Sequence, residues 1–508
     1  MKKYISKEKL KNYNFYLMIF FILGFFSKII KEINPDPDMW FLAATGRYIV
    51  ENKTVPTINP FIIHEEFEIV IQQWIIDIIN YEIYNNFGMT GIYIYALTVF
   101  AIALFVFNKY LKKYISNNKK RLMLIMLAGL YLVQFSTSRP NIVSFIVFTL
   151  LLIVLEKYID YNDKKILLVL PILSLVEINL QSSMWPMMFV IMIPYIFPKK
   201  ISKKNELKSN IKKWLNINGP IIFIMIVMFI TGFLNPNGIN GMLYLIKSYK
   251  AASKCGIMEM SSPTYFSFNG TLLFIAIVIY VFYLTKAIIK KENINFPKFY
   301  MASGTILLSM MCLRNTWYLV FGVIPLLAII INEYEKENDL KLSNNENVDK
   351  NEKKLYLLLL LKCVLKTIII IPVVILLISS TQYNHYNSDI TPLEAVEYIK
   401  KFDHKEVKIF NDFNAGAYLE WCGYKTYIDT RPELFDIKIN NKEDILTEIL
   451  MLNSAQIDFN EFLLKYNFTH LICLDGYAFT TYMENNNEYT VVVDSDGYKL
   501  FEKINFSE

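Results

Sequence analysis

Long apolar segments that alternate with lysine-rich loops constrain this chain more than any other feature of its sequence. A helix that crosses a bilayer needs about 20 mainly apolar residues, or about 17–25 when it is tilted. Only 19% of the 508 residues are charged and 54% are hydrophobic, which excludes a disordered chain. We therefore expect a polytopic α-helical membrane protein with about 11 transmembrane helices. The candidate spans are 14–30, 91–108, 122–136, 141–156, 166–180, 184–198, 217–234, 270–288, 299–314, 316–332 and 355–380.

Basic residues predict how the chain is oriented. Six Lys and Arg lie in 109–121, seven Lys in 199–213, four in 286–298 and five in 336–354. Lys and Arg collect in cytoplasmic loops, and alternation of the spans puts these loops on the side of the N-terminus. The sequence thus predicts a multi-pass plasma-membrane protein with a cytoplasmic N-terminus and an extracytoplasmic C-terminus. The basic excess then serves orientation, and we expect no nucleic acid partner.

The charge balance also divides the chain into two domains. Residues 381–508 contain 11 basic and 22 acidic residues, whereas residues 1–380 contain 41 basic and 24 acidic residues. We expect 1–380 to form the transmembrane domain, with 31–90 as a large outer loop that carries amphipathic helices. We expect 381–508 to form a small extracytoplasmic α/β domain. Its predicted helices begin at 391, 415 and 459, and its predicted strands are 407–410, 425–429, 469–474, 489–494 and 498–501.

Two carboxylates directly follow the first span. They lie in Asn34-Pro35-Asp36-Pro37-Asp38-Met39-Trp40, where the prolines prevent the helix from continuing. Asp36 and Asp38 are therefore held at the water interface, where they can bind a divalent cation or accept a proton from a hydroxyl. The plainer alternative is a turn with two solvated acids.

Few ionisable side chains lie within or near the predicted spans, and these are costly unless they are paired or used. Arg139 and Arg314 can each grip a phosphate in two hydrogen bonds, and the alternative is a snorkelling interfacial arginine. Glu177, followed by Asn179, is predicted to line a cavity. All of these positions map to the outer side. The four histidines and five cysteines show no metal-binding spacing.

In combination, these elements resemble the GT-C superfamily of polytopic glycosyltransferases. The likeness is strongest to a group of prokaryotic membrane proteins with an outer Asp-Pro-Asp-x-Trp loop and a C-terminal α/β domain. It covers nearly the whole chain, in order. The matching elements are Asp36–Trp40, Ala44–Arg47, Val55–Phe61, Gln73–Ile75, Ser138–Asn141, Asn235–Gly238, Arg314–Asn315, Phe410–Leu419 and Tyr427–Phe435.

The resemblance implies an inverting transfer of a hexosyl or pentosyl group from a polyprenyl-phosphate-linked donor. The acceptor would be an envelope glycan, lipid or protein on the extracytoplasmic face. Asp36 or Asp38 would act as general base or hold a divalent cation, Mg or Mn. Arg139 and Arg314 would neutralise the leaving phosphate, because a fixed cation stabilises charge that develops there. The remaining substrate-binding residues would be Glu177, Asn179, Trp40 and Trp74.

Two departures from the group keep other functions open. Gln73 stands where relatives often have Glu, and Asn179-Leu180-Gln181-Ser182 stands where they often have an Asn-x-His-Gly turn. One alternative is a non-catalytic GT-C-like protein of envelope assembly, because a fold does not fix a function. The other is a lipid or polysaccharide transporter, but the sequence shows no internal repeat to support it.

Overall fold

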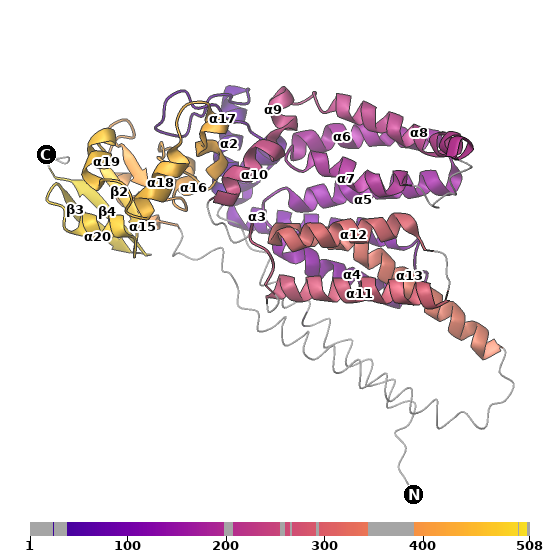
Figure 1. The fold of residues 1–508 in the computed structure, drawn as a ribbon. Coiled ribbons are helices and arrows are strands. Elements are labelled where there is room, and N and C mark those ends of the chain that lie inside the picture. The colour runs from indigo at the N-terminus through magenta and orange to yellow at the C-terminus, as the bar shows by residue number, and fades with distance from the viewer. Residues whose placement is uncertain are drawn as a thin grey trace, which may run out of the picture. The chain divides into compact units, whose positions relative to one another are not determined.

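A computed structural model describes residues 24, 38–197, 207–254, 260–264, 267–290, 294–343, 391–495 and 497–504 (Figure 1). The chain forms two compact units, each assembled from separate stretches of sequence. The first comprises 1–34, 100–136 and 261–383, and the second 35–99, 137–260 and 384–508. The predicted spans 14–30 and 355–380, and the predicted domain boundary near 381, lie outside the described residues.

The first unit is a group of apolar helices. Helix α12 packs on α13, which also contacts α11 and α4. Asn295 caps the start of α12 by accepting from the amide of Lys298, and a proline follows in the first turn. The elements are α4 (Asn118–Leu132), η1 (Val133–Phe135), α11 (Phe268–Lys290), α12 (Phe296–Met311), η5 (Leu313–Tyr318) and α13 (Leu319–Ser343).

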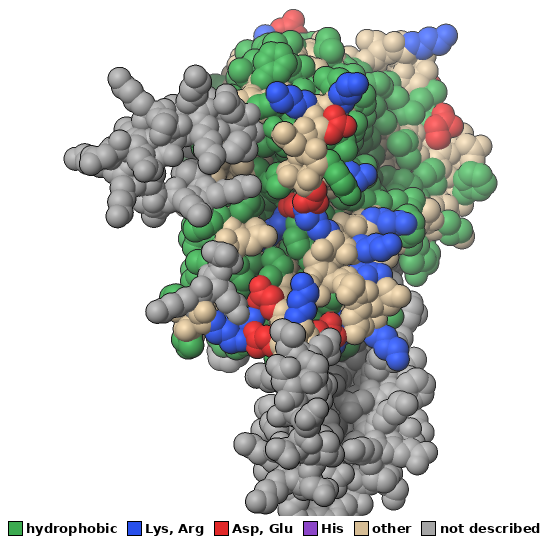
Figure 2. Space-filling model, turned by 90° about the vertical axis from the view of Figure 1, so that its right-hand side faces the viewer, with side chains coloured by type: hydrophobic (Ala, Val, Ile, Leu, Met, Phe, Trp, Pro, Cys, Tyr) green, Lys and Arg blue, Asp and Glu red, His purple; other side chains and the backbone are tan. Residues whose placement is uncertain are grey.

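Ion pairs join helix ends within this unit. Lys120 Nζ at the start of α4 lies 2.6 Å from Glu335 Oε1, and Lys286 Nζ near the end of α11 lies 2.6 Å from Glu333 Oε2. Three of the predicted lysine-rich loops therefore begin or end at one end of the unit. Figure 2 shows a face of the molecule on which basic side chains gather beside acidic ones.

The helices of the second unit pack α5 against α6 and α7, and α6 and α7 against α8. Helix α5 is mostly apolar and ends at Asn162, which adopts the left-handed conformation common at helix ends. The elements are α2 (Met39–Asn52), α3 (Trp74–Leu111), α5 (Asn141–Tyr161), η2 (Lys164–Leu168), α6 (Val169–Leu180), α7 (Trp185–Ile196), α8 (Leu207–Thr231), α9 (Gly238–Met242) and α10 (Tyr244–Lys254).

Four helices of the described residues are long and apolar enough to cross a membrane: Trp74–Leu111, Asn141–Tyr161, Phe268–Lys290 and Leu313–Glu337. The chain is thus a helical membrane protein, and the number of eleven spans stays a prediction. One boundary differs from the sequence prediction. The apolar helix expected to open at Gln73-Trp74 and the span 91–108 form one element, α3, with a break at Gly88, whose positive φ of 60° suits glycine.

The C-terminal residues form the predicted α/β fold, with a four-stranded mixed sheet in the order β1-β2-β4-β3 (Figure 1). Strand β1 runs parallel to β2, whereas β4 is antiparallel to both β2 and β3. The strands are β1 (Ile409–Asn411), β2 (His470–Leu474), β3 (Tyr489–Ser495) and β4 (Tyr498–Lys503). The helices are α15 (Leu393–Ile399), α16 (Gly416–Trp421), η7 (Pro432–Phe435), α17 (Ile437–Asn440), α18 (Ile445–Asn453), α19 (Phe459–Tyr466) and α20 (Ala478–Glu484).

The predicted strand 425–429 is wrong. Thr426 instead forms an isolated parallel bridge with Ile62 of the outer loop, donating its amide to the carbonyl of Phe61 and accepting from the amide of Ile63. Ile62 and Phe67 of the outer loop are buried in the same apolar core as the C-terminal residues. The backbone of Thr426 is therefore hydrogen-bonded to the outer loop and not to the sheet.

Two glycines let backbone segments approach closely in the second unit. A Cβ added to Gly46 in α2 would lie 2.1 Å from the carbonyl oxygen of Asp77 in α3. A Cβ added to Gly416 in α16 would lie 2.2 Å from the carbonyl oxygen of Ile428. Both positions exclude any side chain unless the backbone moves.

We expect Gly46→Ala to lower the thermal unfolding midpoint of the purified protein, because α2 must shift away from α3. Gly304→Ala is the matched control: its added Cβ meets nothing within 4 Å, and alanine favours a helix by up to about 1 kcal/mol over glycine. Equal midpoints for the two variants would contradict the close packing of α2 on α3.

Candidate functional site

Asp38 and Arg139 form an ion pair at the start of helix α2. Asp38 precedes the first residue of α2, and its carbonyl accepts from the amide of Leu42. Its carboxylate oxygen Oδ2 lies 2.7 Å from Arg139 Nη2, and both side chains are partly exposed. The structure thus joins two residues that the sequence predicted separately, one as a base and one as a phosphate clamp.

The turn that carries Arg139 is fixed by neighbouring polar groups. Thr137 Oγ1 accepts from the amide of Arg139, and the buried Asn80 of α3 donates from Nδ2 to the carbonyl of Ser138. Asn80 Nδ2 also donates to the carbonyl of Ile76 one turn earlier. The backbone beneath the guanidinium is therefore anchored to α3, which explains how a loop residue can hold a defined position.

Buried polar side chains lie in α5, which follows this turn in the chain, and at the end of α6. Gln181 donates from Nε2 to Asn141 Oδ1 at 3.1 Å and accepts from Ser144 Oγ at 2.9 Å. Glu177, one turn before Gln181, is fully buried beside Ser144. Gln181, which departs from the Asn-x-His-Gly turn of the group, is thus held by hydrogen bonds from both sides.

The other predicted substrate-binding residues of this unit make contacts within the protein. Trp74 Nε1 donates to Asn179 Oδ1 at 2.9 Å, and Asn179 Nδ2 donates to the carbonyl of Leu234. Trp40 is buried and makes edge contacts with Tyr84 and Tyr418, with ring centroids 5.3 and 5.0 Å apart. Their roles toward a substrate stay predictions.

Two further residues were predicted for the site. Asp36 lies outside the described residues. Arg314 belongs to the first unit, where it sits in η5 (Leu313–Tyr318) and is half-buried. Within the second unit, the structure pairs Asp38 with Arg139, and it places Glu177 beside Ser144 of α5.

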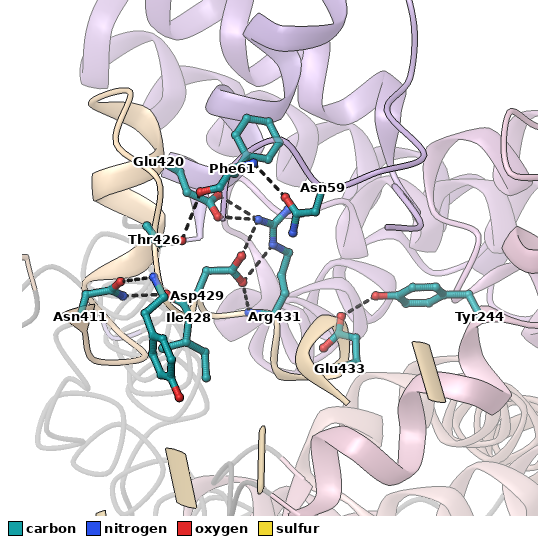
Figure 3. Close-up of polar contacts among 11 residues, drawn as sticks. Asn59, Phe61, Tyr244, Asn411, Glu420, Thr426, Ile428, Asp429, Arg431 and Glu433 are labelled. Carbon is teal, nitrogen blue, oxygen red and sulfur yellow. Dashed lines mark hydrogen bonds and ion pairs between the residues drawn. The ribbon is translucent and has the colours of Figure 1, made fainter. Parts of the chain in front are cut away.

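A buried guanidinium, that of Arg431, is held by two carboxylates of the C-terminal residues (Figure 3). Arg431 Nη2 lies 2.6 Å from Asp429 Oδ2 and 2.8 Å from Glu420 Oε2. The guanidinium carbon lies 4.6 Å from the centroid of the Phe41 ring in α2. Asp77 of α3 faces the same cavity of about 20 Å³ as Arg431. Asp429 and Arg431 thus form an ion pair, and the guanidinium packs on the ring of Phe41 near the start of α2.

The charged forms of Arg431, Asp429 and Glu420 stabilise one another in this buried cluster. Burial raises the pKa of the Glu420 carboxyl well above its ordinary value, although Arg431 counteracts the shift. Burial lowers the pKa of Arg431, but Asp429 and Glu420 outweigh it and the net pKa is raised. Sequence analysis missed Glu420 and Phe41 because only the folded chain brings them to Arg431.

A second contact joins α2 to the same C-terminal segment. Arg47 Nη2 donates to the carbonyl of Trp421 at 2.8 Å, and its guanidinium carbon lies 4.6 Å from the centroid of the Trp421 ring. Arg47 of the Ala44–Arg47 element thus contacts Trp421 at the end of α16. Tyr418 of the Phe410–Leu419 block lies in the same helix and packs on Trp40 of α2.

The described residues do not by themselves form a metal site. Among them, no group of three or more His, Cys, Asp or Glu side chains is placed to hold an ion. One partner of Asp38 is a guanidinium, whose charge would repel a cation. The role of Mg or Mn stays a prediction, and we derive no chemical step through a metal.

We expect Arg431→Gln to destabilise the protein by about 3–5 kcal/mol, because it leaves two buried carboxylates without their cation. Heating the purified protein while following tryptophan fluorescence measures the effect. Lys442→Gln is the control, since its ion pair with Glu66 is exposed and its loss should leave the midpoint unchanged. A midpoint for Arg431→Gln as high as that of the control would contradict a structural role for this cluster.

Comparison with known proteins identifies the fold. No protein-family model and no curated protein matches the chain. The oligosaccharyltransferase of Archaeoglobus fulgidus matches in structure, both with a tethered acceptor peptide containing the NVT sequon and in the apo form, with TM-scores of 0.55 and 0.56 at 9% identity. AglB from the same organism, in complex with an inhibitory peptide and a dolichol-phosphate, matches with a TM-score of 0.54 at 8% identity. Each match covers 90% of this chain and 69% of the other, so the chain has the GT-C fold of these oligosaccharyltransferases.

Proposed function

We propose that the protein transfers a sugar from a polyprenyl-phosphate-linked donor to a cell-envelope acceptor on the extracytoplasmic face. The observation that carries the proposal is the Asp38–Arg139 pair, a carboxylate and a guanidinium 2.7 Å apart at the start of the first outer helix. The oligosaccharyltransferase fold supports the same class of reaction. Neither argument names the sugar or the acceptor.

The pair supplies both charges that such a transfer needs. A hydroxyl or amide of the acceptor attacks the anomeric carbon, its proton passes to the Asp38 carboxylate, and the lipid phosphate leaves with inversion. Negative charge grows on the departing phosphate, and the fixed guanidinium of Arg139 stabilises it there. Arg139 can hold phosphate oxygens in two parallel hydrogen bonds, which a lysine cannot.

The ion pair also suggests the order of events. Without donor, the guanidinium of Arg139 lies 2.7 Å from the Asp38 carboxylate. A donor phosphate would compete for the guanidinium, because guanidinium and phosphate form strong charge-assisted hydrogen bonds. Donor binding would then weaken the hold of Arg139 on Asp38 before the acceptor arrives. Asp36, the other carboxylate of the loop, would assist as a second base or as a cation ligand.

A non-catalytic role in envelope assembly is the second candidate, and one observation favours it. Gln181 occupies a position where relatives often have a histidine, and both ends of its amide are used in buried hydrogen bonds. Such an amide cannot transfer a proton. The transfer assay separates the two candidates.

We expect Asp38→Asn to reduce transfer by about 10²–10⁴-fold, since a positioned general base contributes that much. Purified protein in lipid nanodiscs, a panel of radiolabelled polyprenyl-phosphate sugars and an envelope extract form the assay. Glu51→Gln, at an exposed carboxylate near the end of the same helix, is the control and should keep wild-type transfer. Equal transfer by Asp38→Asn and wild type would refute the role of Asp38, and no transfer by wild type would favour the assembly protein.

Arg139→Lys tests the phosphate role separately. A lysine keeps the charge beside Asp38 but loses the bidentate geometry. We expect a thermal midpoint close to wild type, a raised KM for the lipid-linked donor and an unchanged KM for the acceptor. Arg139→Gln should lower kcat further, because no cation then faces the leaving phosphate. A raised KM for the acceptor alone would contradict the proposal that Arg139 binds the phosphate of the donor.

A further inference from the structure

A second cavity lies on the outer segments of the second unit. Its volume is about 240 Å³, which suits a ligand about as large as one sugar ring. Its walls come from the outer loop that follows α2 and from the turn that follows α8. The lining residues are Thr57, Ile58, Glu68, Ile69, Val70, Pro236, Asn237 and Asn240.

Hydrogen bonds hold both walls in place. The amide of Ile69 donates to the carbonyl of Thr57 at 2.9 Å, within a short antiparallel bridge of the outer loop. Asn237 Nδ2 donates to the carbonyl of Ile71 at 2.8 Å and so joins the two walls. These hydrogen bonds thus fix the shape of the cavity.

Four polar groups of the lining have hydrogen-bonding capacity left over. Asn237 uses Nδ2 on Ile71, which leaves Oδ1 as an acceptor. Asn240 accepts from Lys247 Nζ through Oδ1, which leaves Nδ2 as a donor. Glu68 Oε2 accepts from Asn441 and leaves Oε1 as an acceptor, while the exposed Thr57 hydroxyl can donate or accept.

The chemistry of these groups fits a neutral sugar. A pyranose presents several adjacent hydroxyls, each of them donor and acceptor, beside a ring face of C–H groups. The exposed side chains of Ile58 and Pro236 provide an aliphatic surface for that face. The carboxylate of Glu68 in the lining disfavours a phosphate or another anion.

We propose that this cavity is a subsite for one uncharged sugar residue, recognised by Thr57, Glu68, Asn237 and Asn240. The assignment of a sugar rests on the proposed function, but binding needs no turnover. The sugar has two sources in such a reaction: a glycan on the lipid-linked donor, or a glycan that serves as acceptor. If the sugar belongs to the donor, changes in the cavity raise the KM for the donor. If it belongs to the acceptor, they raise the KM for the acceptor.

Binding is measured first, by saturation-transfer NMR on the full-length protein in nanodiscs. The probes are the methyl glycosides of glucose, galactose, mannose and N-acetylglucosamine. We expect ring protons of at least one probe to be saturated. The double variant Thr57→Val/Asn240→Ala removes two of the four polar contacts and should weaken binding about tenfold or more, since each neutral hydrogen bond contributes several-fold. The control is Thr490→Val/Asn487→Ala, the same changes at exposed positions.

Steady-state transfer then separates the sources. A raised KM for the lipid-linked donor in the double variant identifies the donor glycan, and a raised KM for the acceptor identifies an acceptor glycan; either supports the subsite. Saturation equal to that of wild type in the double variant, or no saturation by any probe, overturns it. Binding lost in the variant while wild type transfers no sugar would refute the proposed function and leave the subsite standing.

Discussion

The placement of helix α2 is the constraint on which the outer part of the second unit depends. Its start carries Asp38, and its middle is pressed against α3 at Gly46, where no side chain fits. It also contacts the C-terminal residues, through the ring of Phe41 on Arg431 and through Arg47 on Trp421. The C-terminal residues therefore act as a support for the helix that presents the carboxylate.

Charge explains why that support is specific. A buried guanidinium repays its desolvation only with carboxylates in good geometry, and Arg431 has two, both in the C-terminal segment. Phe41 then needs only to cover the guanidinium with its ring, which adds a cation–π contact without any charge on α2. The ion pairs stabilise the segment internally, while its contacts with α2 include the Phe41 ring on Arg431 and the hydrogen bond from Arg47 to the carbonyl of Trp421. The C-terminal residues can thus hold their own charged core and still pack on α2.

The sequence predicted the fold class because spans and lysine-rich loops follow from composition alone. It also predicted α16 and α19 closely, and it put Asp38 and Arg139 on the same side. It did not predict that these two residues pair, because topology gives a side of the membrane and not a distance. The strand predicted around Thr426 was wrong for a related reason: Thr426, Tyr427 and Ile428 favour a strand, but the pairing partner is Ile62 and not the sheet. Glu420 reaches Arg431 only through the fold, and no spacing signals it.

The outer loop that joins α2 to α3 connects both proposed sites. Asp38 precedes α2. Thr57 and Glu68, which line the cavity, lie in the segment of the chain between α2 and α3. The same stretch is fixed at Ile62 by Thr426 and at Ile71 by Asn237, so it has little freedom to move alone. Substitutions at Thr57 or Asn240 change only side chains on this fixed frame. Selection of a sugar can therefore change without disturbing the Asp38–Arg139 pair, which is the property that a fold with one reaction and many substrates requires.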